Sequence, residues 1–402
     1  MPRMADGLRL MATVTCAPVR LRTALALLVA FLAATTIALW PYARVTSFIV
    51  RAGSVGGWLE RGARAMTLPI EEHAESIPTR YGVVRGRLYR PTGTPTRTAL
   101  LVSGIHATGI DEPRLVRLAR EAAATGWALV TPELPDLIAY RVTAQSTDVI
   151  EDAAVWLAAR RDLAPDGRIG LMGISFSGGL AIVAAGRPSL RKHTRFVFSV
   201  GGHGDLPRVL KYFCTGIEPP VEGMKPPPPP HDYGLAIVAF GVAEELVPRE
   251  QVVPFREAVR TFLDASGIAY VRPSDAEAGF NRARALEHEL AEPAATLAHY
   301  VNTRNVPELG ARVLPHLGGF GTDPALSPER STAPEAPVFL LHGIDDNVVP
   351  AVESRTLARW LTGKTTVHAF FSRSLAHASL DPEATLADYW GLIVFWRGLL
   401  GP

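Results

Sequence analysis

The feature that most constrains the fold is a short turn of small residues between an apolar strand and an apolar helix. Arg168–Met172 is typical of a buried strand, and Leu180–Ala185 is compatible with a helix. The turn between them holds Ser175, with Gly173 two positions before it and Ser177 two positions after it. A serine on such a sharp strand-to-helix turn points outward, above the N-terminus of the helix. The pattern therefore predicts an exposed hydroxyl beside free backbone N–H groups.

Two later segments supply partners for a nucleophilic serine. Ala336–Leu341 is typical of a buried strand, and the loop after it holds Asp345 and Asp346. His377 lies in the loop behind a further short strand. A serine hydroxyl needs an adjacent base at neutral pH, histidine suits that role, and a carboxylate orients its imidazole. The chain order predicts a triad of Ser175, Asp346 and His377, gathered at one edge of a parallel sheet.

This order and placement resemble the α/β-hydrolase superfamily, and within it the dienelactone-hydrolase-like and prolyl-oligopeptidase-like serine hydrolases. The resemblance rests on the serine turn, the His-Gly-x-x-Asp-x-x-Val-Pro acid loop and the later histidine, and it covers roughly residues 80–213 and 326–400. The chain departs from the usual Gly-x-Ser-x-Gly turn at Ser177. The alternation of short strand-like and helix-like stretches along the chain implies a mostly parallel α/β sheet with helices on both faces.

The identity of the acid is open among three aspartates. The motif spacing favours Asp346 over Asp345, which we expect to close the turn through hydrogen bonds to its own backbone. Asp205 follows the strand Phe196–Val200. It is the third candidate, because some members of the superfamily carry their acid one strand earlier.

Two backbone N–H groups are predicted to form an oxyanion hole for the substrate carbonyl oxygen. One belongs to Phe176, directly after the nucleophile, and the other to Ile105, in the loop after the strand Ala99–Ser103. Two histidines are possible pocket residues, His106 in that loop and His203. The alternative for His106 is a structural hydrogen bond to a neighbouring carbonyl.

Composition excludes several classes of partner. The 402 residues are 48% hydrophobic and 20% charged, which is enough for a large core and more than one unit. The net charge is +2, and the sequence has no run of basic residues with aromatic residues among them. Binding to nucleic acid is therefore not predicted. Two cysteines exclude a disulfide framework. No dinucleotide, Walker or HExxH motif is present, so neither a cofactor nor a metal is predicted.

The N-terminus predicts a membrane anchor. Residues 23–43 carry no charge, and about 20 apolar residues in a helix span a bilayer. Trp40 and Tyr42 suit the membrane interface, and Pro41 is expected to end the helix. Arginines are more numerous before the run than close after it, which predicts a cytoplasmic segment 1–22 and an extracytoplasmic catalytic domain. The alternative is a signal peptide whose cleavage releases a secreted protein.

The rest of the chain divides into three parts. Residues 44–79 are predicted to be a linker with one or two short helices. The catalytic domain would comprise residues 80–213 and 326–402, beginning with an antiparallel edge hairpin at Tyr81–Arg90. Residues 214–325 contain a proline run and several helix-like stretches without a clear parallel strand. They are predicted to form a helical cap over the catalytic edge, and a helical decoration on the side of the domain is the alternative.

The predicted activity is hydrolysis of an ester bond through an acyl-enzyme, with an amide or peptide as the second choice of substrate. The same triad serves acyl transfer to an acceptor other than water, which is the alternative among enzymes. A non-catalytic binding protein that keeps the fold is the alternative outside enzymes. The expected partners are a small-molecule ester or peptide and the membrane.

Overall fold

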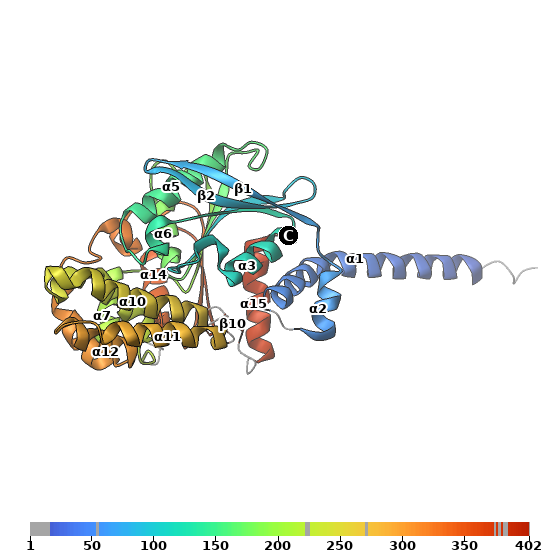
Figure 1. The fold of residues 1–402 in the computed structure, drawn as a ribbon. Helices are drawn as coiled ribbons and strands as arrows, with labels where there is room; N and C mark the ends of the chain where they lie inside the picture. The colour runs from blue at the N-terminus through green and yellow to red at the C-terminus, as the bar shows by residue number, and fades with distance from the viewer. Residues whose placement is uncertain are drawn as a thin grey trace, which may run out of the picture.

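The computed structural model describes residues 17–53, 56–221, 226–269, 272–373, 375–376, 379–380 and 385–401. Its centre is a twisted sheet between layers of helices, and one long helix projects from the body (Figure 1). The sheet has eight strands: β1 (Ile70–Thr79), β2 (Gly82–Pro91), β3 (Arg97–Val102), β4 (Trp127–Pro132), β5 (Ile169–Ile174), β6 (Thr194–Val200), β7 (Val338–Gly343) and β8 (Val367–Ser372).

The strands are arranged in the order β1-β2-β4-β3-β5-β6-β7-β8. Pairing is antiparallel from β1 through β2 to β4, and parallel between all the later neighbours. A separate antiparallel pair joins β9 (Leu375–Ala376) to β10 (Ser379–Leu380). The parallel strands β3, β5 and β7 are buried along almost their whole length, which explains why their sequences are apolar runs without alternation.

Helices cover both faces of the sheet. The helices of the described chain are α1 (Ala17–Ala52), α2 (Gly57–Arg64), α3 (Pro113–Ala123), α4 (Pro135–Ile138), α5 (Gln145–Ala159), α6 (Phe176–Ala185), α7 (Leu206–Thr215), α8 (Asp232–Gly241), α9 (Ala243–Leu246), α10 (Arg249–Ala269), α11 (Pro273–Glu287), α12 (Ala294–Asn302), α13 (Val306–Val313), α14 (Ala351–Leu361) and α15 (Leu386–Leu400). Short 3₁₀ turns lie at Gly109–Asp111, Leu314–His316, Pro324–Leu326 and Pro328–Arg330.

The two faces have separate cores. On one face, α5, α6 and α14 pack on the sheet, and their core continues into the helices from α7 to α13. On the other face, α3, α15 and the end of α1 form a smaller core that is rich in aromatic side chains. The predicted class, a mostly parallel sheet with helices on both faces, is confirmed.

The first helix is longer than the sequence predicts. It does not end at Pro41 but continues through that residue to Ala52. Beyond the proline, Val45 and Phe48 are buried in the smaller core, where Phe48 makes an edge contact with Trp396 at 4.8 Å between ring centroids. This packing offsets the single backbone hydrogen bond that a proline removes.

Among the described residues, one helical stretch is long and apolar enough to cross a membrane, Thr23–Ala52. The exposed large apolar side chains in this stretch lie between Leu25 and Trp40. A membrane span and a signal sequence both meet this description, so the helix fits either of the two alternatives raised by the sequence.

The sheet begins at Ile70 rather than at Tyr81, so the linker prediction is wrong for residues 70–79. An antiparallel edge hairpin is present, but β1 and β2 form it, and the predicted stretch Tyr81–Arg90 supplies only its second strand. Sequence analysis missed β1 because Glu71, Glu72 and His73 are exposed on an edge strand, so no alternation of apolar residues marks it. The short helix predicted in the linker is α2.

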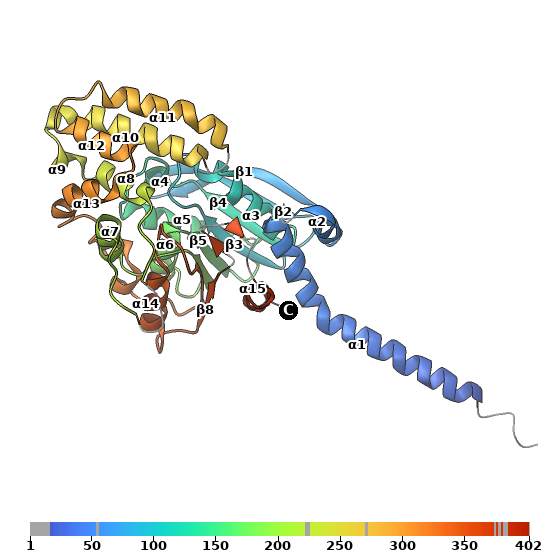
Figure 2. The ribbon, with the colours of Figure 1, turned by 90° about the horizontal axis from the view of Figure 1, so that it is seen from below.

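Between β6 and β7 the described residues form helices and no strand, as the sequence predicts. The helices α8 to α13 pack against one another and against α7. Figures 1 and 2 show them as one group at the end of the molecule opposite the long N-terminal helix.

Candidate active site

The serine turn between strand and helix is present, and its backbone is strained. Ser175 lies between β5 and α6 with φ 55° and ψ −131°, a conformation that non-glycine residues rarely adopt. Its N–H donates to the Val200 carbonyl at 2.7 Å, which ties the turn to the end of β6. Gly173 is required here, because a Cβ on it would lie 2.2 Å from the Ser177 carbonyl oxygen.

Ser177, which replaces the usual glycine, has a role of its own. Its side chain is fully buried, and its hydroxyl donates a hydrogen bond to the Ser103 carbonyl. Ser103 begins the loop that follows β3, so the bond connects the serine turn to that loop. Gly104 lies beside the nucleophile, because a Cβ on it would be in van der Waals contact with the Ser175 Cβ, at 3.4 Å.

The two residues predicted to supply oxyanion N–H groups lie next to the serine. Ile105 and Phe176 both line a cavity with Ser175. Phe176 is the first residue of α6, where the N–H has no carbonyl four residues earlier within the helix. In the described part of the chain, no hydrogen bond from either N–H to another protein group is present.

Asp346 is held by backbone N–H groups in the loop after β7. Its side chain is 3% exposed, and its Oδ1 accepts from the Val348 N–H at 2.8 Å and the Val349 N–H at 3.1 Å. Its Oδ2 lies 3.6 Å from the Nε2 of His342, whose ring also bonds the Val349 carbonyl at 2.7 Å. The loop therefore fixes the carboxylate in one orientation.

Ser175 and Asp346 face a common space. Both line a small cavity of about 30 Å³, together with the ends of β5 and β6, Gly343 and Leu375. Leu375 comes two residues before His377, which lies outside the described residues. The carbonyl oxygen of Leu375 lies only 2.2 Å from where a Gly343 Cβ would be, so this segment packs tightly on the end of β7.

The other two aspartates are placed differently. Asp345 is exposed to solvent. Asp205 caps α7, accepting from the Arg208 N–H at 3.0 Å, and forms an ion pair with Arg330 at 2.6 Å. Neither residue lines either cavity at Ser175, whereas Asp346 does.

Both candidate pocket histidines line the larger cavity at Ser175. His203 is 1% exposed, stacks on Phe176 at 4.9 Å between ring centroids, and bonds the Leu326 carbonyl through Nε2 at 2.7 Å. Burial lowers the pKa of His203 to about 4, so its ring is neutral at neutral pH. Burial also lowers the pKa of His106. The Nδ1 of His106 lies 2.8 Å from the Thr108 hydroxyl and accepts from the Thr108 N–H at 3.2 Å.

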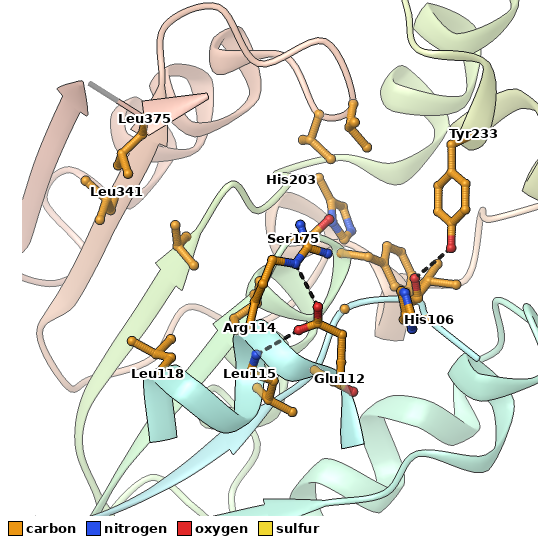
Figure 3. Close-up of a pocket in the computed structure, with 18 of the residues that line it drawn as sticks. His106, Glu112, Arg114, Leu115, Leu118, Ser175, His203, Tyr233, Leu341 and Leu375 are labelled. Carbon is orange, nitrogen blue, oxygen red and sulfur yellow. Dashed lines mark hydrogen bonds and ion pairs between the residues drawn. The ribbon is translucent and has the colours of Figure 1, made fainter. Parts of the chain in front are cut away.

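The larger cavity has a volume of about 560 Å³, and most of its lining is apolar. Figure 3 shows Ser175 in its middle, with Tyr233 and His106 on one side and Leu341 and Leu375 on the other. Helices that are distant in sequence contribute to its walls: α8 and α10 at one end, and α1, α3 and α15 at the other.

Sequence reasoning missed several polar residues of this cavity, among them Glu112, Arg114 and Tyr233. Glu112 caps α3, accepting from the Leu115 N–H at 2.7 Å, and also bonds the Arg114 Nε at 2.7 Å (Figure 3). The Tyr233 hydroxyl donates to the Ile105 carbonyl at 3.1 Å (Figure 3). Glu112 followed by proline is a recognisable helix start, but no local pattern links Tyr233 to a residue 128 positions away.

No protein-family model matches this chain, and no curated protein matches it. Among solved structures it is similar to an esterase from Pyrobaculum calidifontis, at 15% identity over 84% of each chain with a TM-score of 0.42. It is also similar to the Pyrococcus horikoshii acylaminoacyl peptidase, at 14% identity over 86% of this chain and 43% of that one, with a TM-score of 0.42. It is similar as well to a dienelactone hydrolase from Anabaena variabilis, at 15% identity over 82% of this chain and 98% of that one, with a TM-score of 0.40.

The fold can be assigned from the chain's own architecture. The eight strands have one antiparallel edge and a parallel remainder, with a single exchange of neighbours at β3 and β4. The strained serine lies between β5 and α6, and the aspartate follows β7. The strand order, the strand directions and the serine turn together show that this chain has the α/β-hydrolase fold.

Proposed function

We propose that this protein is a serine hydrolase that cleaves an ester bond with Ser175, His377 and Asp346. The observation that carries the proposal is the strained Ser175 facing a buried, backbone-anchored aspartate across a cavity of about 30 Å³. An imidazole between these two side chains would complete a triad, and His377 follows Leu375, which lines the same cavity, by two residues.

The proposed reaction has two stages. His377 takes the hydroxyl proton while the Ser175 Oγ attacks the ester carbonyl, and the N–H groups of Ile105 and Phe176 stabilise the oxyanion. The imidazolium then gives its proton to the leaving alcohol, which leaves an acyl-enzyme. In the second stage His377 activates water, the acyl group leaves as the acid, and Ser175 regains its proton. Asp346 holds the imidazole in the required tautomer.

An ester is favoured as substrate by the larger cavity at Ser175. Its lining is mainly apolar, which suits an acyl group better than the polar backbone of a peptide. Transfer of the acyl group to an alcohol instead of water remains the alternative reaction. Adding a small alcohol as acceptor and measuring the ratio of new ester to free acid distinguishes the two.

The helices α8 to α13 act as a cap in this proposal. Tyr233 of α8 bonds the loop that carries Ile105, and Gly267 of α10 lies against His106, where a Cβ would come within 2.8 Å of the ring nitrogen. These contacts support a cap over the catalytic edge rather than a decoration on the side of the domain.

The helix α1 holds the catalytic domain to the membrane, with the domain on the extracytoplasmic side. The exposed apolar residues from Leu25 to Trp40 and the distribution of arginines support this arrangement. The test is fractionation: the full chain should stay in the membrane after high-salt and carbonate washes. A mature protein that starts near residue 39 would establish the signal-peptide alternative instead.

Labelling with a fluorophosphonate tests the nucleophile. The full chain in detergent should form one adduct, which peptide mass spectrometry locates at Ser175. Ser175→Ala should abolish labelling, whereas the neighbouring control Ser177→Ala should still be labelled because its hydroxyl bonds the Ser103 carbonyl. A folded wild type that neither reacts with the probe nor hydrolyses any of a panel of esters would refute the proposal and favour a binding protein on this fold.

A further inference from the structure

The last helix exposes an apolar face that the catalytic domain does not use. In α15, Leu386, Trp390 and Val394 are 88%, 56% and 47% exposed, and their spacing of four places them on one side of the helix. The opposite side, which includes Leu392 and Trp396, is buried in the smaller core. Large apolar side chains that cluster on a surface mark a contact with a partner or a membrane.

Contacts to α1 locate this face beside the proposed membrane span. The ring of Trp390 stacks on Tyr42 at 5.5 Å between centroids with planes 6° apart, and the Arg397 guanidinium lies 4.7 Å from the centroid of the Tyr42 ring. Tyr42 follows the exposed apolar stretch of α1, which ends at Trp40. Aromatic residues at such a position are typical of the membrane interface.

The direction of α15 fits the surface of a bilayer. Figure 1 shows α15 across the base of α1, and Figure 2, which views the molecule from below, shows α15 end-on while α1 remains extended. A helix perpendicular to a membrane span lies in the plane of the membrane surface. The face formed by Leu386, Trp390 and Val394 is therefore able to lie in the leaflet that α1 crosses.

A second apolar group lies on the same side of the body. Trp58 and Leu59 of α2 are exposed, and α2 is tied to α1 by a hydrogen bond of 2.8 Å from the Ser47 hydroxyl to the Ala63 carbonyl. Together with the exposed face of α15 they form what we call the interfacial band: Trp58, Leu59, Leu386, Trp390 and Val394.

The larger cavity extends from the nucleophile to the junction of α1 and α15, beside this band. From Ser175 it extends to Phe48, Ile49 and Ala52 of α1 and to Leu392 and Trp396 of α15. The junction of α1 and α15 is therefore a wall of the cavity on its inner side and carries part of the interfacial band on its outer side. An acyl chain that passes this junction would lie in a cavity whose lining is mostly apolar up to the serine.

We infer that the substrate is a membrane lipid with a long acyl chain in ester linkage, taken directly from the leaflet at the junction of α1 and α15. The interfacial band seats the domain on the bilayer, and the larger cavity holds the acyl chain with its carbonyl carbon at Ser175. This inference rests on the proposed function and names the substrate class of the same site.

The test compares a lipid-borne with a water-soluble substrate. The full chain is reconstituted in phosphatidylcholine vesicles, and kcat/KM is measured for 4-methylumbelliferyl palmitate in the bilayer and for 4-methylumbelliferyl acetate in solution. Leu386→Glu with Val394→Glu should lower the palmitate-to-acetate ratio at least tenfold, because two charges oppose seating in the leaflet. The matched control is Val155→Glu with Val253→Glu, which alters exposed valines outside the band and should leave the ratio unchanged.

A second variant tests the cavity. Ala52→Trp adds bulk at the end of the cavity nearest α1, so it should also lower the palmitate-to-acetate ratio at least tenfold. Melting temperatures of all variants check folding. If Ala52→Trp does not fold, Ala52→Phe takes its place, and activity is measured on esters of increasing acyl chain length. The smaller obstruction should shorten the longest acyl chain that the enzyme accepts.

A covalent probe separates this inference from the function on which it rests. Wild type should react faster with a hexadecyl fluorophosphonate in the vesicles than with an ethyl one, and the Leu386 and Val394 variant should lose that preference. Equal rates for both probes, with substrate ratios that no variant changes, would overturn the lipid inference and leave the serine hydrolase intact. Failure of both probes to label Ser175 would remove the proposed function itself.

Discussion

Two cavities meet at Ser175, and they are built in different ways. The smaller one is enclosed by residues at the ends of β5, β6 and β7, together with Leu375, so backbone geometry sets its shape. The larger one is enclosed mainly by side chains from α1, α3, α7, α8 and α15, elements from the whole length of the chain. In the proposed reaction, residues of the smaller cavity carry out the catalytic steps, which would be the same for every substrate. The larger cavity would select which substrate binds at Ser175.

The largest effect should come from the nucleophile, on the side of the smaller cavity. Ser175→Ala and His377→Ala should each lower kcat on the order of 10⁴-fold or more, and the double variant should be hardly worse, because the residues act as a unit. The melting temperature should change little. The measurement is steady-state kinetics on short and long esters. A loss of activity on the long ester alone would contradict the assignment of Ser175 and His377 to a step that all substrates share.

The next effect concerns the acid. Asp346→Asn should lower kcat about 10³- to 10⁴-fold, because an amide at this position favours the wrong histidine tautomer. Asp345→Asn is the matched control, one residue earlier and exposed, and should lower kcat less than about threefold. A large effect from Asp345 and a small one from Asp346 would reverse the assignment.

A smaller effect should appear in the pH dependence of stability, through His203. Burial lowers the pKa of its ring to about 4, against 6.5 for the unperturbed group, so the unfolded chain binds more protons than the folded one between these values. The free energy of unfolding should therefore fall as the pH falls from 6.5 to 4, by about 3 kcal/mol from this residue. Urea unfolding of His203→Gln at both pH values should show a shallower dependence than wild type.

The smallest effect should come from the bond between the serine turn and the loop that carries Ile105. Ser177→Ala removes the donor to the buried Ser103 carbonyl and should lower the free energy of unfolding by about 1 kcal/mol. Activity on short and long esters should fall by the same factor, since the lost hydrogen bond supports the serine turn and the loop of Ile105, which all substrates would use. Ser177→Gly, the residue usual at this position, serves as the comparison; a variant as stable as wild type would show that the hydrogen bond contributes nothing.

Sequence reasoning worked best where a local pattern carries the structure. The serine turn, the buried strands and the acid loop were all predicted within a few residues, because small residues at fixed offsets and uninterrupted apolar runs leave few alternatives. It failed at Pro41 and at β1 for opposite reasons. A local breaker was overruled by the packing of Phe48, and a polar edge strand had no local pattern at all.

The sequence by itself determined the sheet class, the position of the serine turn and the presence of an apolar N-terminal helix. The tertiary structure decided that Asp346 rather than Asp205 faces the cavity of Ser175, and that α1, α15 and α8 enclose a common apolar space. The reason is physical: turns and buried strands depend on residues within a few positions of one another. A cavity depends on which distant side chains pack together, as Tyr233 does with Ile105, and no local spacing records that contact.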